Sequence, residues 1–284
     1  MFKFVIYISV CTLAVTGQRA DEAVISNRRA LEASEIRVVV TSSPCSNETF
    51  RWNSEKRFIE VCNGVQWVGV DSCFNVWGSN FNPGASCKHL KQQGVEKNGI
   101  YWIQPPGATC PFQAYCDMKT DGGGWMLLYA YKHRGGTKYD LVTALPTSPD
   151  GYSHQLLNNM GISAGWAQEL RFYCTTSHHN RVVHFKTNNR NIIQTAYDGK
   201  KHFSVSDWSS KTEKLTGHTA HLPDATTHIW AVTHQTAGFT DFPFYRSGYH
   251  WGIGPKYAPA GRFECDDFPN NYNYDTLHRV FVRD

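Results

Sequence analysis

The stretch CKHLKQQGVEKNGIYWIQPPGATCPFQAYCDMKTDGGGW, residues 87–125, carries the local signals that decide the fold. A short helical run begins at Cys87 and can end at Gly94, because glycine accepts the left-handed turn that follows a helix. The three glycines before Trp125 let two backbone segments approach each other with no Cβ between them. Turn residues separate three expected strands, residues 100–103, 112–118 and 125–131.

Several motifs in this stretch resemble the start of a fibrinogen-related (fibrinogen C-terminal-like) domain. They occur in the family's order: Cys87, Asn98-Gly99-Ile100-Tyr101-Trp102-Ile103, Tyr115-Cys116-Asp117-Met118 and Asp121-Gly122-Gly123-Gly124-Trp125. Each motif alone is weak, but their order within so short a stretch is a specific signal. The resemblance implies an α+β fibrinogen C-terminal-like domain over residues 85–284, with Cys87 bridged to Cys116.

Composition and charge restrict the function classes. The chain has 284 residues, of which 41% are hydrophobic, so it can bury a sizeable core. The formal net charge is only +4, and lysine and arginine are scattered, which disfavours a nucleic-acid partner. The sequence contains no nucleophile elbow, phosphate-binding loop or dinucleotide fingerprint. We therefore expect no enzyme, and a secreted enzyme is only a remote alternative.

The first residues are typical of a secretory signal. Residues 1–17 combine the positive Lys3, an apolar run and the small-residue end Val15-x-Gly17. The apolar run is too short to span a bilayer comfortably, so a signal anchor ranks second and no membrane span is expected. Residues 18–43 are polar and predict a flexible leader. Its Arg28-Arg29 pair is either a processing site or two solvated charges.

Eight cysteines remain beyond the signal, and an even number in an exported chain favours disulfides over metal ligation. These are Cys45, Cys62, Cys73, Cys87, Cys110, Cys116, Cys174 and Cys265. The sequence leaves their connectivity open. Besides the bridge that the resemblance implies, we expect Cys45–Cys62 and Cys174–Cys265, which leaves Cys73–Cys110.

Residues 44–70 predict a small β-module ahead of the large domain. Apolar and charged residues alternate across the turn Asn53-Ser54, and the hairpin turn Asn63-Gly64 follows, which together indicate a three-stranded meander. A unit of this size needs a staple, which a Cys45–Cys62 bridge would supply. Asn47 begins the triplet Asn47-Glu48-Thr49 and is a glycosylation acceptor. Residues 71–84 are the linker to the large domain.

Beyond Trp125, strands mixed with short helices and long loops indicate an α+β fold. We expect a helix near residues 154–160 and strands at 169–174, 181–186, 192–197, 229–234 and 277–282. Residues 250–275 are rich in glycine, proline, asparagine and aspartate, and predict loop rather than core.

The same segment holds a candidate calcium site. Calcium prefers six to eight oxygen ligands, and carboxylates and amides gather here. The candidate ligands are Asp266, Asp267, Asn271, Asn273 and Asp275. The resemblance also implies calcium and glycan binding near this end of the domain, whereas the alternative is that these residues only form turns. Neighbouring residues of a strand point to opposite sides, so Asp266 and Asp267 would make a poor acid–base pair.

Aromatic residues of the segment are candidate ligand-binding residues, because ring faces stack on sugars and anchor protein interfaces. We select Tyr257, Tyr272 and Tyr274, which could otherwise merely cover the end of a sheet. The histidines lack zinc-binding motifs. We interpret His178, His179, His218, His221 and His228 as scattered surface residues.

Taken together, these patterns predict a secreted, extracellular and non-catalytic protein of the matrix, including a mineralised matrix. Its fibrinogen-like domain would recognise a glycan or an extracellular-matrix protein. The alternative is a calcium-dependent lectin of innate recognition. The sequence shows no coiled coil or collagen repeat through which the chain would multimerise.

Overall fold

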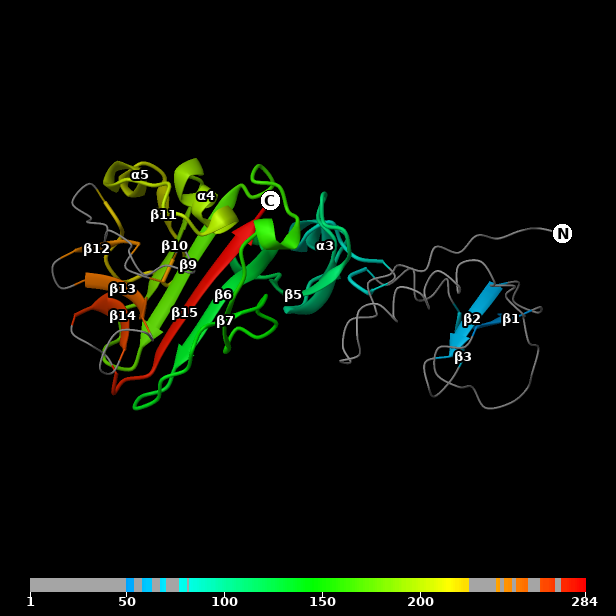
Figure 1. Ribbon diagram of the computed structural model, residues 1–284, viewed down its shortest axis with the longest axis horizontal. Coiled ribbons are helices and arrows are strands. Elements are labelled where there is room, and N and C mark those ends of the chain that lie inside the picture. The colour runs from blue at the N-terminus through cyan, green and yellow to red at the C-terminus, as the bar shows by residue number, and fades with distance from the viewer. Residues whose placement is uncertain are drawn as a thin grey trace, which may run out of the picture. The chain divides into compact units, whose positions relative to one another are not determined.

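The chain divides into two units, Met1–Asn82 and Pro83–Asp284, in a computed structural model (Figure 1). The structure describes residues 50–53, 58–62, 67–69, 77–80, 82–224, 239–240, 243–246, 249–254, 261–268 and 272–284. Several predictions lie outside these residues: the signal and leader, the pairing of Cys45 and Cys73, glycosylation of Asn47, the strand 229–234, and the roles of His228, Tyr257 and Asn271.

The first unit contains the expected antiparallel meander. Its strands are β1 (Phe50–Asn53), β2 (Phe58–Cys62) and β3 (Trp67–Gly69), in the order β1-β2-β3. Phe50 is opposite Val61, and Cys62 is opposite Trp67. The two pairings place consecutive strands side by side, as alternating apolar and charged residues across tight turns predict.

The second unit is built on one large sheet, here called the main sheet. Its strands follow the order β11 (Thr212–Lys214), β10 (Val183–Thr187), β9 (Glu169–Thr176), β15 (Thr276–Arg283), β6 (Trp125–His133), β5 (Phe112–Asp117) and β4 (Gly99–Ile103). A parallel pair, β7 (Val142–Thr143) and β8 (Tyr152–His154), joins the sheet through β6. The last strand, β15, pairs with both β6 and β9, so the end of the chain completes the middle of the sheet (Figure 1).

A second sheet, here called the small sheet, packs on the main sheet. It consists of β12 (Tyr245–Arg246), β13 (Tyr249–Gly254) and β14 (Arg262–Asp267). These strands correct the expectation that residues 250–275 form only loop. Trp251 and Phe263 alternate with small or polar neighbours along β13 and β14, as in strands, and are fully buried. Residues 264–267 of β14 are buried as well, so this strand belongs to the core.

Aromatic rings fill the space between the two sheets. Phe172 of β9 lies at the centre, 5.1 Å from the ring of Phe185 and 5.5 Å from that of Trp251. Trp208 comes from the short helix α5 (Val205–Ser209) and packs on the same ring at 5.6 Å. The Phe185 ring stacks on Phe172, and the two tryptophan rings meet it edge-on. Both arrangements are favourable beyond the area that the rings bury. The small sheet is therefore held to the main sheet by an aromatic core.

The predicted helix in the deciding stretch is present as α3 (Cys87–Gln92). Ser86 caps it, since its hydroxyl accepts a hydrogen bond from the His89 N–H at 2.9 Å. The disulfide Cys87–Cys116 ties α3 to β5, as the resemblance implies. With helices and a mostly β core together, the α+β prediction is confirmed.

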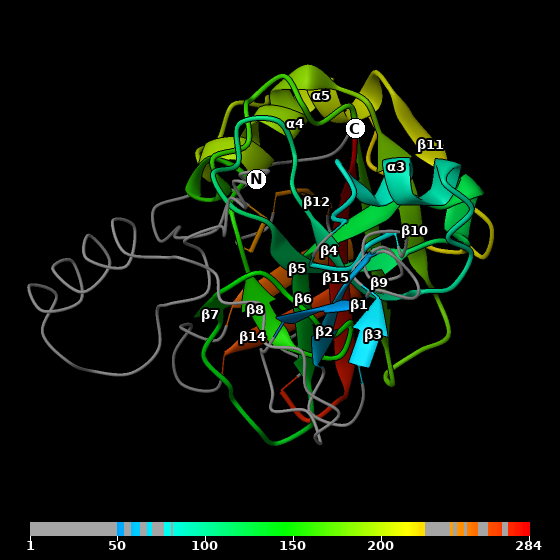
Figure 2. The same ribbon diagram turned by 90° about the vertical axis from the view of Figure 1, so that its right-hand side faces the viewer.

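The expected strand at residues 192–197 is wrong: this segment lies in α4 (Arg190–Asp198). Asn189 caps the helix by accepting from the N–H groups of Asn191 and Ile192, and Gly199 ends it in a left-handed conformation. These two caps outweigh the strand preference of the Ile192-Ile193 pair. Helices α4 and α5 lie together at one edge of the unit in both views (Figures 1 and 2).

The helix expected at residues 154–160 is also wrong in extent. Its first residue ends β8, and only a single 3-10 turn, η3 (Asn158–Met160), follows. A second such turn, η2 (Thr120–Gly122), precedes Trp125. Gly161 ends η3 in a left-handed conformation, so there is no room for a full helix.

Candidate functional site

The two neighbouring aspartates of β14 occupy an irregular point of the small sheet. The pairing of β13 with β14 shifts between His250 and Trp251, which leaves Asp266 as an extra residue on β14. Asp266 adopts a positive φ of 58°, an uncommon conformation for a residue other than glycine. Because of this bulge, the alternation expected for Asp266 and Asp267 fails and both residues are buried.

Arg181 neutralises the first of these carboxylates. Its Nε donates to Asp266 Oδ2 at 2.6 Å. The backbone N–H of His221 donates to Oδ1 at 3.0 Å, and the His221 ring nitrogen Nδ1 lies 3.2 Å from the same oxygen. Asp266 thereby joins the turn after β9 to the segment that follows β11. A carboxylate buried this deeply is stable only with such partners.

The second carboxylate faces two histidines. Asp267 Oδ1 accepts from the Cys265 N–H at 3.0 Å. Its Oδ2 lies 3.2 Å from His178 Nδ1 and 3.4 Å from His179 Nε2. Burial, with a further contribution from Arg181, lowers the pKa of His179 below its ordinary value. These histidines therefore lie together beside buried acids, which corrects the expectation that they are scattered.

A pocket of about 390 Å³ opens beside Asp266. His221 and Tyr249 form one side of it, with their rings stacked at a centroid distance of 3.3 Å. Its lining combines acidic, basic, aromatic and aliphatic side chains: Val183, Lys214, Ala220, His221, Leu222, Pro223, Asp224, Phe244, Tyr245, Tyr249 and Asp266. The pocket offers ring faces and polar groups together, which suits a polar ligand with flat or ring-shaped parts.

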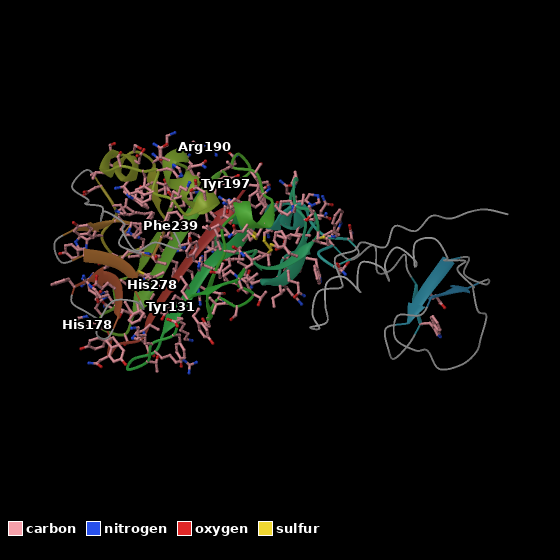
Figure 3. The ribbon with its side chains drawn as sticks, viewed as in Figure 1. Tyr131, His178, Arg190, Tyr197, Phe239 and His278 are labelled. Carbon is pink, nitrogen blue, oxygen red and sulfur yellow. A yellow bond between two sulfur atoms is a disulfide. The ribbon has the colours of Figure 1, made fainter. Side chains whose placement is uncertain are left out.

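Exposed aromatic residues continue from the pocket across the end of β14. Tyr274 is 40% exposed and stacks on His178 with 4.4 Å between ring centroids. Phe268, which follows Asp267, is 58% exposed. We call the surface formed by His178, His221, Tyr249, Phe268 and Tyr274 the aromatic face. Figure 3 shows His178 on the side of the small sheet, away from Arg190 and Tyr197 of α4.

The remaining predicted site residues brace a neighbouring turn. Asp275 Oδ1 accepts from the Gly135 N–H, and the Tyr272 hydroxyl donates to the Gly136 carbonyl, both at 2.8 Å. The Asn273 carbonyl lies against Gly135. Within the described ranges, no three histidine, cysteine, aspartate or glutamate side chains are arranged to hold a metal ion. The side chains of Asp266, Asp267 and Asp275 contact protein groups, and calcium binding stays a prediction.

A disulfide anchors the site from beneath. Cys265 precedes Asp266 on β14 and is joined to Cys174 on β9, the pairing expected above, with 5.8 Å between the Cα atoms. Both cysteines are fully buried. Cys110 is also in a disulfide, and the partner expected for it, Cys73, lies outside the described residues. The bridge to Cys174 holds the end of β14 against the main sheet.

Sequence reasoning missed Arg181 and His221. Arg181 lies 85 residues before its carboxylate, and His221 lies 45 residues before it. No local motif marks either residue, because the folding of β9, β10 and β14 creates the contacts. The neighbouring aspartates Asp266 and Asp267 were the one usable signal. If such a pair is buried, it needs a cation, which an arginine or histidine from elsewhere in the chain must supply.

Residues 84–155 match the family model for the C-terminal globular domain of fibrinogen beta and gamma chains. The fibrinogen beta chain of Gallus gallus is 44% identical over 45 residues, which cover 16% of this chain and 10% of that protein. Angiopoietin-4 of Mus musculus is 45% identical over 42 residues, which cover 15% of this chain and 8% of that protein. The matches therefore span a tenth or less of these relatives' own length.

The fibrinogen-like globe domain of human ANGPTL6 is a similar solved structure, with a TM-score of 0.40 and 13% identity. The match covers 71% of this chain and 96% of that one. The resemblance read from the deciding stretch is confirmed by the family model over residues 84–155. No helix in the described part of the chain is long and apolar enough to cross a bilayer.

Proposed function

We propose that this chain is a non-catalytic extracellular protein that binds a matrix or glycan partner, since residues 84–155 match the family model for fibrinogen C-terminal globular domains. The binding surface is the aromatic face with its adjoining pocket. One observation carries the proposal: His221 and Tyr249 stack at the wall of a pocket beside the buried Asp266. Secretion and glycosylation of Asn47 belong to the same proposal.

The chemistry of the pocket supports binding rather than catalysis. The Asp266 carboxylate is already engaged by Arg181 and His221, and Asp267 faces His178 and the Cys265 N–H. Carboxylates held in this way position loops and are poorly placed to transfer protons to a substrate. The ring faces of Tyr249 and Tyr274 supply the contact area that sugars and protein side chains use.

The disulfides support an extracellular location. Bridges form and persist in oxidising compartments, and both Cys87–Cys116 and Cys174–Cys265 are buried within the fold. A protein built in this way keeps the aromatic face rigid outside the cell. Among extracellular roles, a matrix component that recognises a glycan or a matrix protein fits a preformed pocket with a mixed lining.

The proposal is tested by binding of the purified full chain to a glycan array and to immobilised matrix polymers. Tyr249→Ala and Tyr274→Ala each remove a ring of the aromatic face, and we expect binding to weaken by about tenfold or more. Tyr139→Ala is the matched control, because Tyr139 is also exposed but lies outside this face. Equal losses in all three variants would show that the partner binds elsewhere.

The same assay separates the matrix reading from a calcium-dependent lectin. Binding is measured with calcium and after addition of a chelator. A matrix contact made by rings and hydrogen bonds is expected to survive the chelator, whereas a calcium-organised glycan site would lose its ligand. In the second case Asp267→Ala should abolish any stabilisation of the protein by added calcium.

A further inference from the structure

Two histidines of the main sheet lie beneath the small sheet and contact backbone carbonyl groups in it or close to it. His278 on β15 and His133 on β6 are fully buried. The Nε2 of His278 lies 2.8 Å from the Glu264 carbonyl oxygen, and that of His133 lies 2.8 Å from the Tyr272 carbonyl oxygen. A carbonyl only accepts, so each Nε2 carries a proton and each Nδ1 presents a lone pair.

These two Nδ1 atoms lack a hydrogen-bond partner among the described residues. Aromatic rings pack against both imidazole rings. The ring of His133 stacks on Phe263 at 3.7 Å, and that of His278 meets Trp251 at 4.7 Å and an angle of 78°. Phe263 and Trp251 belong to the small sheet. A proton added at Nδ1 would place a charge and an unsatisfied donor between the sheets.

Few charged groups offset such a proton. Asp275 favours the charged form of His133, whereas His133 disfavours the charged form of His278. The Glu264 carboxylate on β14 is already paired with Arg262, and Cys174, opposite His278 on β9, is held in a disulfide. Burial lowers the pKa of His133, and it lowers the pKa of His278 to about 4. The closed arrangement therefore resists protonation.

We propose that acidification loosens the packing of the small sheet on a main sheet that stays folded, while Cys174–Cys265 keeps β14 tethered to β9. Tyr249 and Phe268 then shift relative to the rest of the aromatic face. Phe263 and Trp251 of the small sheet pack against the two imidazole rings, so parting of the sheets is the motion that would admit water beside them. The strand pairing within the main sheet does not involve these nitrogens. The opening itself requires no ligand. Its consequence, release of a bound partner in acid, rests on the function proposed above.

The direction of the pH dependence follows from where protons bind. Histidine in an open, hydrated state titrates at its ordinary pKa of about 6.5. Between that pH and about 4, the open state takes up protons that the closed state of His278 refuses. The opening equilibrium therefore rises as the pH falls through this window, by up to about tenfold per pH unit for each histidine. Above and below this window, the opening equilibrium no longer changes with pH.

Hydrogen exchange of the ligand-free full chain tests the proposal. Protection is measured between pH 7.5 and 4 and corrected for the intrinsic exchange rate. We expect amides of β13 and β14 to lose at least about tenfold in protection as the pH falls from 6.5 to 4.5, while β6, β9 and β15 keep theirs. Unchanged protection of β13 and β14 across this range, or parallel loss in both sheets, would overturn the proposal.

His278→Gln supplies the specific variant, since glutamine keeps an N–H donor for the Glu264 carbonyl and does not titrate. In acid it should lose less protection of the small sheet than the wild type does, because only His133 still titrates. His202→Gln is the control, because His202 lies partly exposed beyond α4 and pairs with Asp198. A response of His278→Gln equal to that of the control would contradict the proposal.

If His278→Gln does not fold, the ring protons of His278 are followed in the wild type by NMR. Titration near 6.5 with no change in β14 would equally overturn the inference. No ligand takes part in these measurements, so their failure would leave the binding function standing. Loss of binding at neutral pH in Tyr249→Ala, in turn, leaves the acid response unaffected.

Discussion

Two arginines pack against Trp125, and one of them forms a buried ion pair. The guanidinium of Arg283 lies 4.0 Å from the Trp125 ring centre, and that of Arg171 lies 5.1 Å from it. Arg171 also donates to Asp117 at 2.7 Å, with side-chain exposures of only 3% and 10%. Burial acts to raise the pKa of Asp117, but Arg171 and Thr120 outweigh it and bring the pKa to about 2.

Removing Arg171 should therefore destabilise the folded protein strongly. In Arg171→Met the Asp117 carboxylate stays buried without its partner, and we expect a loss of about 3–5 kcal/mol in the free energy of unfolding, measured with urea. Arg279→Met is the control, because its partner Asp150 is half exposed and such pairs contribute at most about 1 kcal/mol. Equal losses in the two variants would refute the role given to the buried pair.

The same carboxylate sets an acid limit on stability. Its pKa is lower in the folded protein, about 2, than its ordinary value of 3.8. The stabilisation is therefore fully present above pH 3.8, and it is lost as the pH falls towards 2. We expect Asp117 to contribute about 2 kcal/mol at neutral pH. We compare the urea midpoints of the wild type and of the double variant Asp117→Asn/Arg171→Met as the pH falls. The double variant should lack this part of the acid dependence, and a profile like that of the wild type would argue against it.

At the scale of elements, the glycine turn before Trp125 depends on close backbone contacts. Gly123 has a φ of 79°, and a Cβ there would lie 2.2 Å from the Met118 carbonyl oxygen. Gly124 is similarly placed, with its Cβ position 2.6 Å from the Lys88 Cα of α3. The turn therefore lets α3 and the strands β5 and β6 approach each other, as expected from the three consecutive glycines.

Gly123→Ala and Gly136→Ala separate the two reasons why glycine is needed, which are its positive φ and the close approach of other backbone atoms. Both residues have a φ near 78°, but nothing lies within 4 Å of a Cβ at Gly136. Gly136→Ala should lose only the conformational part, about 1–2 kcal/mol. Gly123→Ala adds a collision with fixed backbone, and we expect at least about 2 kcal/mol more. Thermal unfolding compares the two variants, and similar melting temperatures would refute the packing argument.

Helices and strands were predicted correctly where several local sequence signals agreed. They were predicted wrongly where a single signal decided the assignment. From Cys87 to Trp125, caps, turns and alternation all point the same way, and α3, β4, β5 and β6 follow. At residues 192–197 two neighbouring isoleucines favoured a strand, and the caps Asn189 and Gly199 decided for a helix. Helix ends deserve more weight than a short apolar run.

At the scale of the whole molecule, the candidate site was only partly predictable. Sequence composition singled out Asp266, Asp267 and Tyr274, which do lie at one place. From composition alone, these residues were predicted to form a loop that could hold calcium. The bulge in β14 and its arginine partner could not be foreseen, because both arise from tertiary pairing. The cation that balances Asp266 is Arg181, from the far end of the turn after β9. Contacts of this range leave no local signal.

The two buried disulfides connect these scales. Cys87–Cys116 fixes α3 on β5 beside the glycine turn, and Cys174–Cys265 fixes β14, with the aromatic face, on β9. Closing loops of 29 and 91 residues restricts the unfolded chain as well as the folded one. The placement of the proposed binding surface therefore depends on the second bridge, as the fold of residues 84–155 depends on the first.

Disulfide mapping of the purified, non-reduced protein tests this arrangement most directly. Proteolysis without reduction, followed by mass spectrometry, should yield one linked peptide pair containing Cys87 and Cys116 and another containing Cys174 and Cys265. Free thiols at these positions, or Cys265 linked to any cysteine other than Cys174, would contradict the fold and remove the basis for the binding surface.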